Sequence, residues 1–565
     1  MGVCVGKSKT YRKLDDSDCL PLEVKHKKLD DNACPPSEVK PQPEAISKEI
    51  IEASNTSQDS SLSVEQVAEL RRDLEALRVA RLLELGVSEA TASSTMPISC
   101  PPAAEPANIR VMQWNLLADG LSDDGFLVPR ILADWPAGPE QMPSNDGTPV
   151  DFTQLIQEIV ASEGKEEELK QLKAKYDVPI AKANFDAVID WKVRELQIQL
   201  TIIAAGRPDI LIFQELDHYS SLANGLLKLG YSSKLCDAQE YIPAHMAGHH
   251  VETAEGISRF RDFVDEAGHS FSPVLGSTAM RLRLEGHGFT ECIKTAANEL
   301  GIGDQVLSED GKIAKTAFLG LPDGTGPLLR AAGLDPESFD DMGVAIFWRT
   351  DRLAAQGLKL HVFNTESGKG SGATLAVRLK DCKSGQDLTV FGAHLKSGSS
   401  PDKEELRLTT QVNVADGLCS LLKEYSRESA VIVGLDANSH PQIIAPDGQS
   451  SVWRSIHECS FESVWDKYFG SDGGSLSDDA RDPPVTVNKI RGPLSRQASK
   501  IGTHAYYCID YVFFDPQRLT MRGHALEPKR FPSSSSALPH VLPTLSNPSD
   551  HYPVVVDVGW ASKAE

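Results

Sequence analysis

Short apolar runs recur along most of this chain, and several of them end in a polar residue that can bind a cation. The runs lie at residues 109–114, 209–215, 342–348, 388–395, 430–438, 508–515 and 552–560. Apolar runs of about four to eight residues, bounded by polar ones, are typical of strands buried on at least one face of a sheet. Helical patterns around 191–205 and 403–425 alternate with them, so the sequence predicts an α/β fold.

The chain of 565 residues divides into unequal parts. Residues 1–63 mix Lys, Asp, Ser and Pro with few large apolar residues, which is typical of a disordered tail. Residues 64–107 hold the pattern of an amphipathic helix, which ends near Gly86, and then a linker rich in Ser, Pro and Ala. We expect one large domain over residues 108–562. Two insertions interrupt it, at 127–183 and 231–340.

Charge and composition exclude several classes of protein. The net charge of −23 argues against broad nucleic-acid affinity, because Lys and Arg that neutralise phosphates supply most non-specific binding. From Asp341 to Glu565, however, 24 Lys and Arg stand against 26 Asp and Glu, so a locally basic pocket stays open there. No apolar run approaches the about 18 residues of a membrane-spanning helix, and the first residues lack the apolar centre of a secretory signal. The ten cysteines form no CxxC pair and no spacing that would hold zinc, so we expect a cytoplasmic chain with reduced thiols.

The polar residues that follow the apolar runs are of the types that hard cations prefer. They are Asn115, Glu215, His394, Asp436 with Asn438, Asp510, and Asp550 with His551. A strand that ends in a carboxylate or amide delivers a fixed oxygen to the rim of its sheet, where a ligand can bind. Mg²⁺ takes carboxylate, amide and water oxygens, and usually only about one or two protein carboxylates together with substrate phosphate. Glu215, with Asn115 and Asp550, fits that need, so the sequence predicts a Mg²⁺ site.

Two pairs within this set indicate more specific chemistry. Asp436 and Asn438 are two residues apart, so both side chains face the same side of an extended strand. The carboxylate could orient or deprotonate a water molecule, and the amide could hold a phosphoryl oxygen. Asp510 could hold the imidazole of His551 in one tautomer and stabilise its charged form. Taken alone, Asp436 and Asn438 are equally explained by a turn at a strand end, where Asp and Asn are common, and His551 by a packing or surface position.

The ordered set of motifs resembles a known superfamily. The motifs are WN at Trp114, QE at Gln214, HLK at His394, D-x-N at Asp436, IDY at Ile509 and SDH at Ser549. In this order they are similar to the endonuclease/exonuclease/phosphatase superfamily. The blocks VMQWNLLADGL, DWKVR, RPDILIFQELDHY and PPVTVNKIR look closest to nocturnin and to deadenylases of the carbon-catabolite-repression type. One departure concerns the D-x-N motif, because Leu435 separates Gly434 from Asp436 where family members usually show Gly-Asp-x-Asn.

The resemblance implies a four-layer α/β sandwich, in which two facing mixed sheets are flanked by helices. It assigns the binding of Mg²⁺ to Asn115, Glu215 and Asp550. It assigns catalytic roles, from activation of water to contact with the scissile phosphate, to His394, Asp436, Asn438, Asp510 and His551. It assigns contact with substrate phosphates to Lys396, Lys489 and Arg491, for which a solvated surface charge is the alternative.

The function that this resemblance implies is Mg²⁺-dependent hydrolysis of a phosphoester. Two substrates compete: the 2′-phosphate of NADP(H) and the 3′ end of RNA, such as a poly(A) tail. We favour the dinucleotide, because a compact substrate needs only a local basic cluster whereas an extended polyanion meets the acidic surface. A catalytically silent interaction module is an alternative of another class. It is disfavoured because degenerate relatives normally lose a catalytic position, and all the expected positions are present here.

The first residues predict an attachment to membranes. MGVCVGKS resembles the start of an N-myristoylated protein, with Gly2 as the acceptor and Cys4 as a palmitoylation site, although Gly6 stands where Ser or Thr is expected. One acyl chain binds membranes only marginally, so a second chain on Cys4 or the nearby basic residues would have to contribute. An ordinary disordered N-terminus is the alternative. The sequence gives no indication of protein partners.

Overall fold

The computed structural model describes most of the chain after residue 61. The described residues are 62–94, 108–122, 126, 141–143, 149–151, 158, 161, 167, 171, 185–231, 250–253, 256–259, 284, 288–308, 311–314, 326–334, 343–364, 370–470, 482–491 and 503–561. Gly2 and Cys4 lie outside these residues, as does almost all of the predicted tail, so acylation, membrane attachment and cytoplasmic location stay predictions. Among the described helices, none is both long and apolar enough to cross a membrane.

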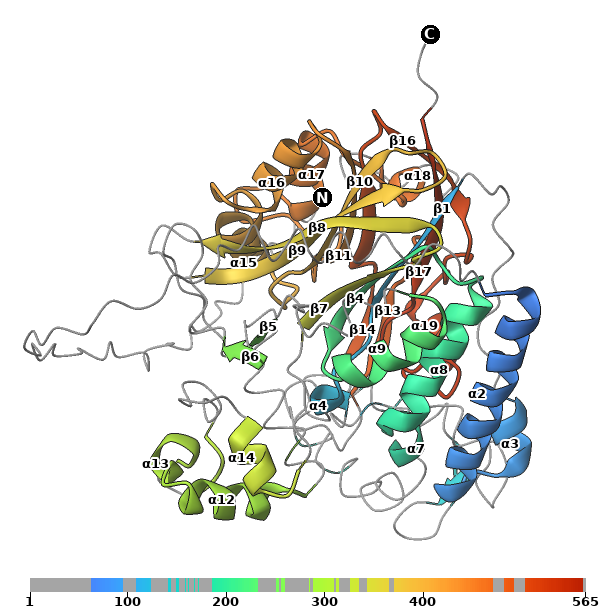
Figure 1. Cartoon of the computed structure of the whole chain (residues 1–565), viewed down its shortest axis with the longest axis vertical. Coiled ribbons are helices and arrows are strands. Elements are labelled where there is room, and N and C mark those ends of the chain that lie inside the picture. Colours follow the sequence, from blue (N-terminus) through green and yellow to red (C-terminus); the bar gives the residue numbers. More distant parts are fainter. Residues whose placement is uncertain are drawn as a thin grey trace, which may run out of the picture. The chain divides into compact units, whose positions relative to one another are not determined.

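The first sheet has five strands in the order β16-β17-β1-β4-β7 (Figure 1). Their bounds are β1, Ile109–Asn115; β4, Ile210–Leu216; β7, Gly343–Trp348; β16, Leu519–His524; and β17, Val554–Trp560. The neighbouring strands β1 and β4 run parallel, and every other pair in this sheet is antiparallel. β1 is buried along its whole length, which explains why its sequence IRVMQWN does not alternate cleanly between apolar and polar residues.

The second sheet has six strands in the order β12-β15-β11-β10-β9-β8. Their bounds are β8, Leu353–Asn364; β9, Gly370–Asp381; β10, Asp387–His394; β11, Ala430–Asp436; β12, Glu462–Ser463; and β15, Asp510–Phe514. Here β10 and β11 run parallel and the other pairs are antiparallel. Each sheet therefore has one parallel pair near its centre.

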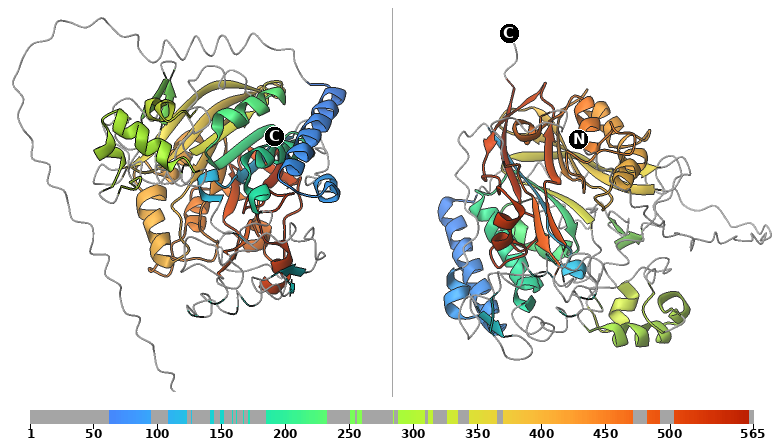
Figure 2. Two further views of the ribbon diagram at one scale, coloured as in Figure 1. Left: turned by 90° about the horizontal axis from the view of Figure 1, so that it is seen from below. Right: turned by 180° about the vertical axis from the view of Figure 1, so that it is seen from behind.

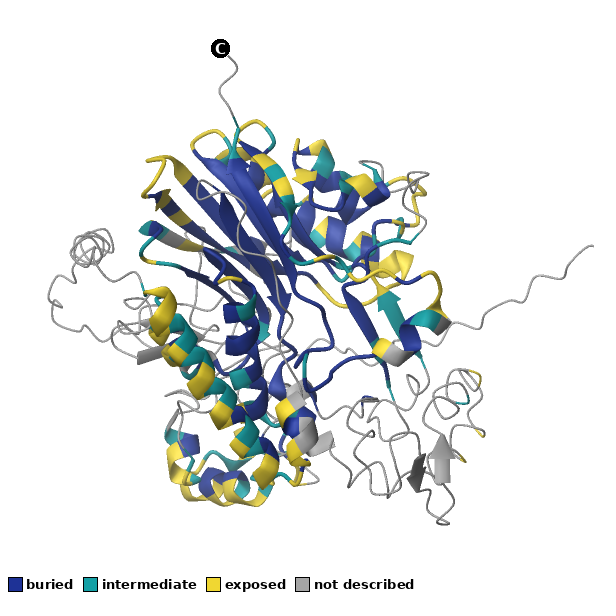
Figure 3. Cartoon of the chain, turned by 90° about the vertical axis from the view of Figure 1, so that its right-hand side faces the viewer, coloured by how far each residue is buried: buried dark blue, intermediate teal, exposed yellow. Residues whose placement is uncertain are grey.

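The two sheets pack face to face over one large apolar core, and their strands are mostly buried (Figure 3). Two glycines, Gly392 of β10 and Gly434 of β11, pair across the parallel strands of the second sheet. A Cβ atom at Gly434 would stand 2.6 Å from Cδ1 of Ile212 in β4, and one at Gly392 would stand 2.8 Å from Cγ1 of Val344 in β7. Both positions therefore need glycine, because the facing sheet approaches too closely for a side chain.

Helices cover the outer faces of both sheets (Figures 1 and 2). On the side of the five-stranded sheet they are α8, Trp191–Ala204, and α9, Tyr219–Lys228, with α2, Val64–Glu84, packed against α8. On the side of the six-stranded sheet they are α15, Pro401–Arg407; α16, Leu418–Tyr425; and α17, Val452–Glu458. The predicted arrangement of two facing mixed sheets flanked by helices is confirmed.

Shorter elements complete the description. The helices are α3, Glu89–Ser94; α4, Asp119–Ser122; α7, Phe185–Ile189; α12, Thr290–Glu299; α13, Gly303–Val306; α14, Gly326–Ala331; α18, Asp466–Phe469; α19, Ser534–Ala537; and a 3₁₀ turn, Leu538–His540. The strands are β2, Gln141–Pro143; β3, Pro149–Asp151; β5, His250–Thr253; β6, Gly256–Arg259; β13, Val487–Ile490; and β14, His504–Tyr507, which pair as β2 with β3, β5 with β6, and β13 with β14. The helices α12 to α14 lie within the predicted second insertion and share an apolar cluster of their own.

One helix predicted from the sequence, over residues 403–425, is wrong as a single element. α15 passes into a π-helical turn, Leu408–Val412, and the chain then leaves the helix before α16 begins. Gly417 caps α16 in an extended conformation, and the Gly417 N–H donates back to Val414 O at 2.8 Å. The apolar pattern continues across this break because both segments pack on the same core, so periodicity alone did not reveal it.

Candidate active site

The polar residues predicted to form the site end strands that point to one edge of the sandwich. In the first sheet, parallel β1 and β4 end near Asn115 and Glu215. In the second sheet, parallel β10 and β11 end at His394 and Asp436, which are paired in register. Asp510 begins the antiparallel strand β15 directly opposite Asp436, and so reaches the same edge. The topology of the two sheets thus brings together residues that lie far apart along the chain.

Glu215 occupies a distorted part of β4. The pairing with β7 shifts register between Phe213 and Leu216, and Glu215 has a φ of 53°, which is rare for a residue with a side chain. Its Oε2 accepts a hydrogen bond from the N–H of Ala118 at 3.3 Å. A bulge of this kind turns a side chain away from the regular pleat, and backbone strain of this kind persists where the surrounding structure fixes it.

Asp436 lies at the centre of a buried group of polar side chains. Its Oδ2 accepts a hydrogen bond from Nδ2 of Asn115 at 2.8 Å and lies 3.4 Å from Nε2 of His394. Nε2 of His394 also lies 3.8 Å from Oε1 of Glu215. The first sheet and the second sheet therefore contribute interacting residues to one site.

Asn438 follows Asp436 with a φ of 49°. Its backbone N–H donates to Asp436 Oδ1 at 2.9 Å, and its side-chain Nδ2 donates to Leu395 O at 3.0 Å. The first bond holds the Asn438 backbone against the carboxylate, and the second orients its side-chain amide. The extended strand on which the spacing argument relied ends at Asp436, so Asn438 reaches this position through a left-handed turn and not through strand alternation. Leu435, the residue that departs from the family pattern, is fully buried. The positions of Asp436 and Asn438 are therefore set by the end of strand β11.

Asp510 and His551 form a buried hydrogen-bonded pair. Nδ1 of His551 lies 2.8 Å from Oδ2 of Asp510, and Oδ1 of Asp510 accepts from Nε2 of Gln113 at 3.1 Å. Burial opposes a charge on the imidazole, but the carboxylates of Asp510 and Asp550 outweigh it and raise the pKa of His551 to about 10. The two carboxylates therefore favour the charged form of His551, and its Nδ1 is directed at Asp510.

Asp550 connects this pair to the basic residues at the end of β13, Lys489 on the strand and Arg491 directly after it. Its Oδ2 forms an ion pair with Nζ of Lys489, and its Oδ1 lies 3.9 Å from Nε2 of His551. Burial opposes ionisation of Asp550, but the positive charges of Lys489 and His551 hold its pKa below the usual range. Phe126 lies beneath two cations, with its ring centre 5.8 Å from Nζ of Lys489 and 4.6 Å from the guanidinium carbon of Arg491.

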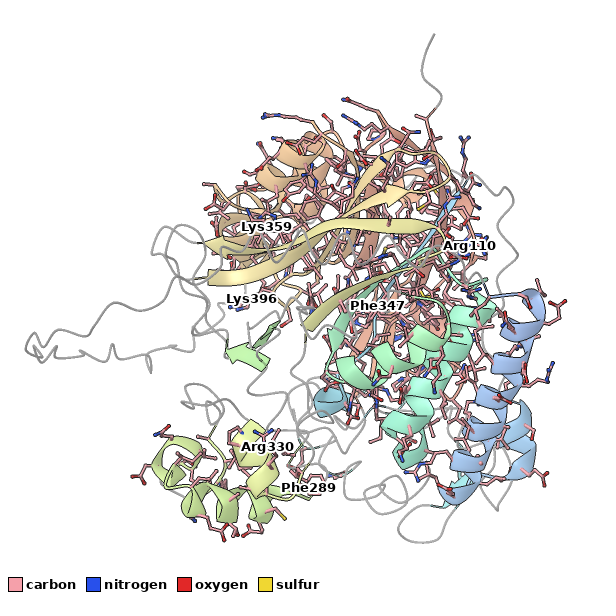
Figure 4. The ribbon with its side chains drawn as sticks, in the orientation of Figure 1. Arg110, Phe289, Arg330, Phe347, Lys359 and Lys396 are labelled. Carbon is pink, nitrogen blue, oxygen red and sulfur yellow. The ribbon has the colours of Figure 1, made fainter. Side chains whose placement is uncertain are left out.

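Lys396 differs from the other two predicted phosphate contacts. It follows His394 and is exposed (Figure 4). Its backbone is held on both sides, because Lys396 N donates to Gln411 Oε1 at 2.9 Å and Lys396 O accepts from Arg407 Nη1 at 2.8 Å. The Lys396 side chain therefore extends from a fixed backbone position near the edge of the site, whereas the Lys489 side chain is already paired with Asp550.

Two sets of residues have the chemistry of a cation site. Ligand atoms of Asp436, Asp510 and His551 lie within 4.8 Å of one another. The set predicted from the sequence consists of oxygen donors only, and in it Asp550 Oδ1 is buried with no hydrogen-bond partner among the described residues. Mg²⁺ prefers oxygen ligands, so by donor type the oxygen-only set suits Mg²⁺ better than the set with His551.

Several residues that shape the site were not identified from the sequence. Arg194 of α8 and Gln113 of β1 are fully buried and bond to site segments. Ser549 Oγ donates to Asn115 O at 2.6 Å and accepts from His551 N at 3.0 Å. Thr486 Oγ1 accepts from the backbone N–H of Asp510 at 3.1 Å. All four residues lie within motifs quoted above, DWKVR, VMQWNLLADGL, PPVTVNKIR and SDH, but the motifs alone assigned them no role.

Comparisons with known proteins agree with these observations. No protein-family model matches the chain. Nocturnin of Drosophila melanogaster is 24% identical over 229 residues, a match that covers 38% of this chain and 32% of that protein. The chain thus matches about a third of the length of this curated relative.

Solved structures of related fold are similar at a lower level. The human Nocturnin catalytic domain with bound sulfate anion has a TM-score of 0.37 and 15% identity, with 81% of this chain and 95% of that chain covered. ANGEL2, a 2′,3′-cyclic phosphatase, has a TM-score of 0.39 and 14% identity, with 80% of this chain and 95% of that chain covered.

The two facing mixed sheets are the arrangement that the resemblance to the endonuclease/exonuclease/phosphatase superfamily implies. The sequence similarity to Nocturnin of Drosophila melanogaster over 229 residues agrees with the motif blocks.

Proposed function

We propose that this chain is a Mg²⁺-dependent phosphoesterase that hydrolyses a phosphate ester of a nucleotide. One observation carries the proposal: the Asp510–His551 pair and the group of Asp436, Asn115 and His394 meet at the edge where both parallel strand pairs end. A charged imidazolium beside several carboxylates supplies both acid and base functions within one buried site.

The residues of the chain have distinct roles in the proposed reaction. Asp436 orients and deprotonates the attacking water, and Asn438 and His394 hold oxygens of the scissile phosphate. His551, kept protonated by Asp510, stabilises the negative charge that develops on phosphate oxygens. Asn115, Glu215 and Asp550 would hold Mg²⁺, which neutralises phosphate charge and orients substrate when it is bound.

We propose the 2′-phosphate of NADP(H) as the substrate. The support is a compact basic group formed by Lys489 of β13 and Arg491 directly after it, which lie over the ring of Phe126 beside Asp550. The chain carries a net charge of −23, which penalises an extended polyanion more than a small dinucleotide. The match to Nocturnin supports the same choice of enzyme class, while the choice between substrates rests on this charge argument.

A direct competition tests the substrate. Purified full-length protein, Mg²⁺, NADPH and a poly(A) oligonucleotide are mixed at equal substrate concentration, and release of phosphate and shortening of RNA are followed together. We expect release of the 2′-phosphate with the RNA intact. Preferential shortening of the RNA, with NADPH untouched, would make the protein an exonuclease of the deadenylase type. Absence of both reactions would favour a catalytically silent module.

Arg491 gives a second test of the same proposal. A guanidinium binds a phosphate through two parallel hydrogen bonds, which neither alanine nor lysine can reproduce. We expect Arg491→Ala to raise the KM for NADPH at least ~10-fold, because loss of a charge-assisted hydrogen bond costs about 1.5–3 kcal/mol. Arg530→Ala, which removes an exposed arginine that lies over the ring of Tyr468, is the control and should leave the KM unchanged. An equal KM in both variants would remove Arg491 from the substrate site.

A further inference from the structure

Arg194 carries a positive charge that is buried behind the candidate active site. It comes from α8, which packs on the outer face of the five-stranded sheet, and its side chain is 1% exposed. Burial lowers the pKa of its guanidinium, and the carboxylates of Asp119, Asp217, Asp550 and Glu215 act in the opposite direction. A buried charge is costly unless its hydrogen bonds are satisfied, so the partners of Arg194 show what keeps it there.

Those partners are the backbones of two segments that carry site residues. Nη2 donates to Leu116 O at 2.6 Å and also to Leu117 O, and both carbonyls directly follow Asn115. Nε donates to Pro548 O at 2.9 Å, two residues before Asp550. One planar guanidinium therefore connects the end of β1 with the loop that leads into β17.

The geometry of the first segment shows why it needs support. Leu117 has a φ of 60°, in the left-handed region that leucine rarely adopts. The next residue, Ala118, donates its N–H to the carboxylate of Glu215 at 3.3 Å. Arg194 accordingly fixes the strained backbone at Leu117, and the next residue holds Glu215. Ser549 Oγ donates to Asn115 O and so joins the end of β1 directly to the loop that leads into β17.

Further side chains hold the guanidinium in place. Nη1 lies 3.6 Å from Oδ1 of Asp119, whose Oδ2 lies 3.2 Å from Nε2 of His218. The ring of His218 stacks on Trp191 with centroids 4.2 Å apart, and the Arg194 guanidinium carbon lies 5.5 Å from the Trp191 ring centre. An ordered set of contacts thus supports Arg194 from the side away from the catalytic residues.

We propose that Arg194 is a positioning residue for the Mg²⁺ site, which sets the separation of Asn115, Glu215 and Asp550 by clamping the two segments that present them. The inference rests on the proposed function, because it concerns the same cation. Residues that orient metal ligands without touching the metal typically affect affinity or activity by about 10–100-fold when they are changed. Lysine at this position keeps the charge but cannot reach three carbonyls in one plane.

The structure supplies a matched control at the other end of β1. Arg110 is also buried, also bonds to a backbone carbonyl, Ala205 O at 2.9 Å, and also pairs with a carboxylate, that of Asp557. Its side-chain bonds to Asp557 and Ala205 lie at the end of β1 opposite the candidate site. Arg110→Lys and Arg194→Lys thus disturb buried arginines of the same kind at opposite ends of one strand.

The test measures binding of Mg²⁺ to full-length protein by titration calorimetry, and then kcat and KM for NADPH across a range of Mg²⁺ concentrations. We expect Arg194→Lys to weaken Mg²⁺ binding and to raise the Mg²⁺ concentration for half-maximal activity at least ~10-fold. At saturating Mg²⁺ the KM for NADPH should stay within about threefold of that of the unmodified protein, because Arg194 does not face the substrate residues Lys489 and Arg491. Arg110→Lys should lower the melting temperature and leave Mg²⁺ binding unchanged.

Each result separates the two proposals. Equal Mg²⁺ affinity in Arg194→Lys and Arg110→Lys, with the unmodified protein active, would overturn the positioning role alone. Unmodified protein that neither binds Mg²⁺ nor hydrolyses NADPH, poly(A) or an inositol phosphate would overturn the proposed function, and the positioning role with it. If Arg194→Lys does not fold, Asp119→Asn decides instead. A weaker Mg²⁺ affinity in Asp119→Asn supports the role, and an unchanged affinity contradicts it.

Discussion

The two ends of the five-stranded sheet both bury charged side chains but satisfy them differently. Where β1 begins, Nε and Nη2 of Arg110 donate to both carboxylate oxygens of Asp557, at 2.7 and 2.9 Å (Figure 4). Asp209 nearby accepts from the Arg110 backbone N–H at 2.8 Å and from Nη1 of Arg349 at 3.2 Å. Each carboxylate at this end therefore meets a fixed donor.

Where β1 finishes, several polar atoms are left without such a donor or acceptor. Asp550 Oδ1, His394 Nδ1 and Gln113 Oε1 are buried and have no hydrogen-bond partner among the described residues. A buried polar atom without a partner costs about 1–3 kcal/mol. The charges where β1 begins thus stabilise the fold, whereas those where β1 finishes are available to bind a ligand. Substitutions where β1 begins should therefore mainly lower stability, and substitutions where β1 finishes should mainly lower activity.

The largest expected effect is the loss of activity in Glu215→Gln. The change keeps the shape of the side chain but removes the charge that would hold Mg²⁺, so we expect at least a ~10²-fold fall in kcat/KM with little change in melting temperature. Asp557→Asn, at the opposite end, is the control and should lower the melting temperature while kcat/KM of the folded protein stays within about threefold. More than a tenth of the original activity in Glu215→Gln would remove Glu215 from the metal site.

Arg110→Met should produce the largest loss of stability. The change leaves the Asp557 carboxylate buried without its main donor, which typically costs about 3–5 kcal/mol, while Asp209 keeps its bond from the backbone N–H of residue 110. Chemical denaturation measures the free energy of unfolding, and activity of the remaining folded protein measures the site. A stable Arg110→Met variant with reduced activity would mean that the two ends are not separate in function.

Mg²⁺ should stabilise the protein through the site end only. A ligand that binds only the folded state stabilises it by about 2.7 kcal/mol at a concentration 100 times its Kd. We expect the melting temperature to rise with added Mg²⁺ in the unmodified protein and in Asp557→Asn, and to stay constant in Glu215→Gln. Chelation of the metal should reverse the rise. An equal rise in Glu215→Gln would place Mg²⁺ elsewhere, for example at Asp436 and Asp510.

Gly434→Ala tests the region between the two ends. The added methyl group would stand 2.6 Å from Ile212 Cδ1 and force the sheets apart, at a cost of about 1–3 kcal/mol. Gly357→Ala on β8 is the control, because a Cβ there meets nothing within 4 Å. Because Gly434 is two residues from Asp436, we also expect a fall in kcat. Equal melting temperatures for both variants would show that the sheets can separate without cost.

The smallest expected effect concerns stability at acid pH, and it involves a residue at neither end of the five-stranded sheet. Burial, with Lys359 nearby, lowers the pKa of His361 to about 4, and its Nε2 lies 2.9 Å from the Tyr425 hydroxyl. In the unfolded chain the imidazole takes up a proton near pH 6.5, whereas in the folded chain it stays neutral at that pH. The contribution of His361 to the free energy of unfolding is therefore complete above pH 6.5 and is lost as the pH falls towards 4. We expect His361→Gln to reduce the acid-induced loss of stability by on the order of 1 kcal/mol at pH 5. An unchanged profile would assign that loss to other groups.

The sequence predicted the strand-end residues well for a physical reason. A residue at the end of a buried strand can only point to the rim of its sheet, and two parallel pairs place four such ends together. The pairing of Asp510 with His551 was likewise predicted, because both residues stand beside strands that reach the same edge. Motif order was enough to bring them together without any knowledge of distances.

The supporting contacts could not be predicted in the same way. Arg194 bonds to the backbone carbonyls of Leu116, Leu117 and Pro548, and a carbonyl has no signature in a sequence. The bulge that turns Glu215 depends on the register between β4 and β7, which is set by packing across the whole sheet. The break within the predicted helix 403–425 was hidden because its two segments share one apolar face.

The place of β17 in its sheet has a consequence for synthesis of the protein. β17 lies between β16 and β1 and pairs Val558 with Ile109, so a late strand fills the middle of the sheet beside an early one. During translation β1 is synthesised first, and more than 400 residues are added before its antiparallel neighbour β17. His551 emerges just before that strand. A nascent chain therefore holds an open sheet edge and an incomplete candidate site, and the site can be complete only after the sheet has closed.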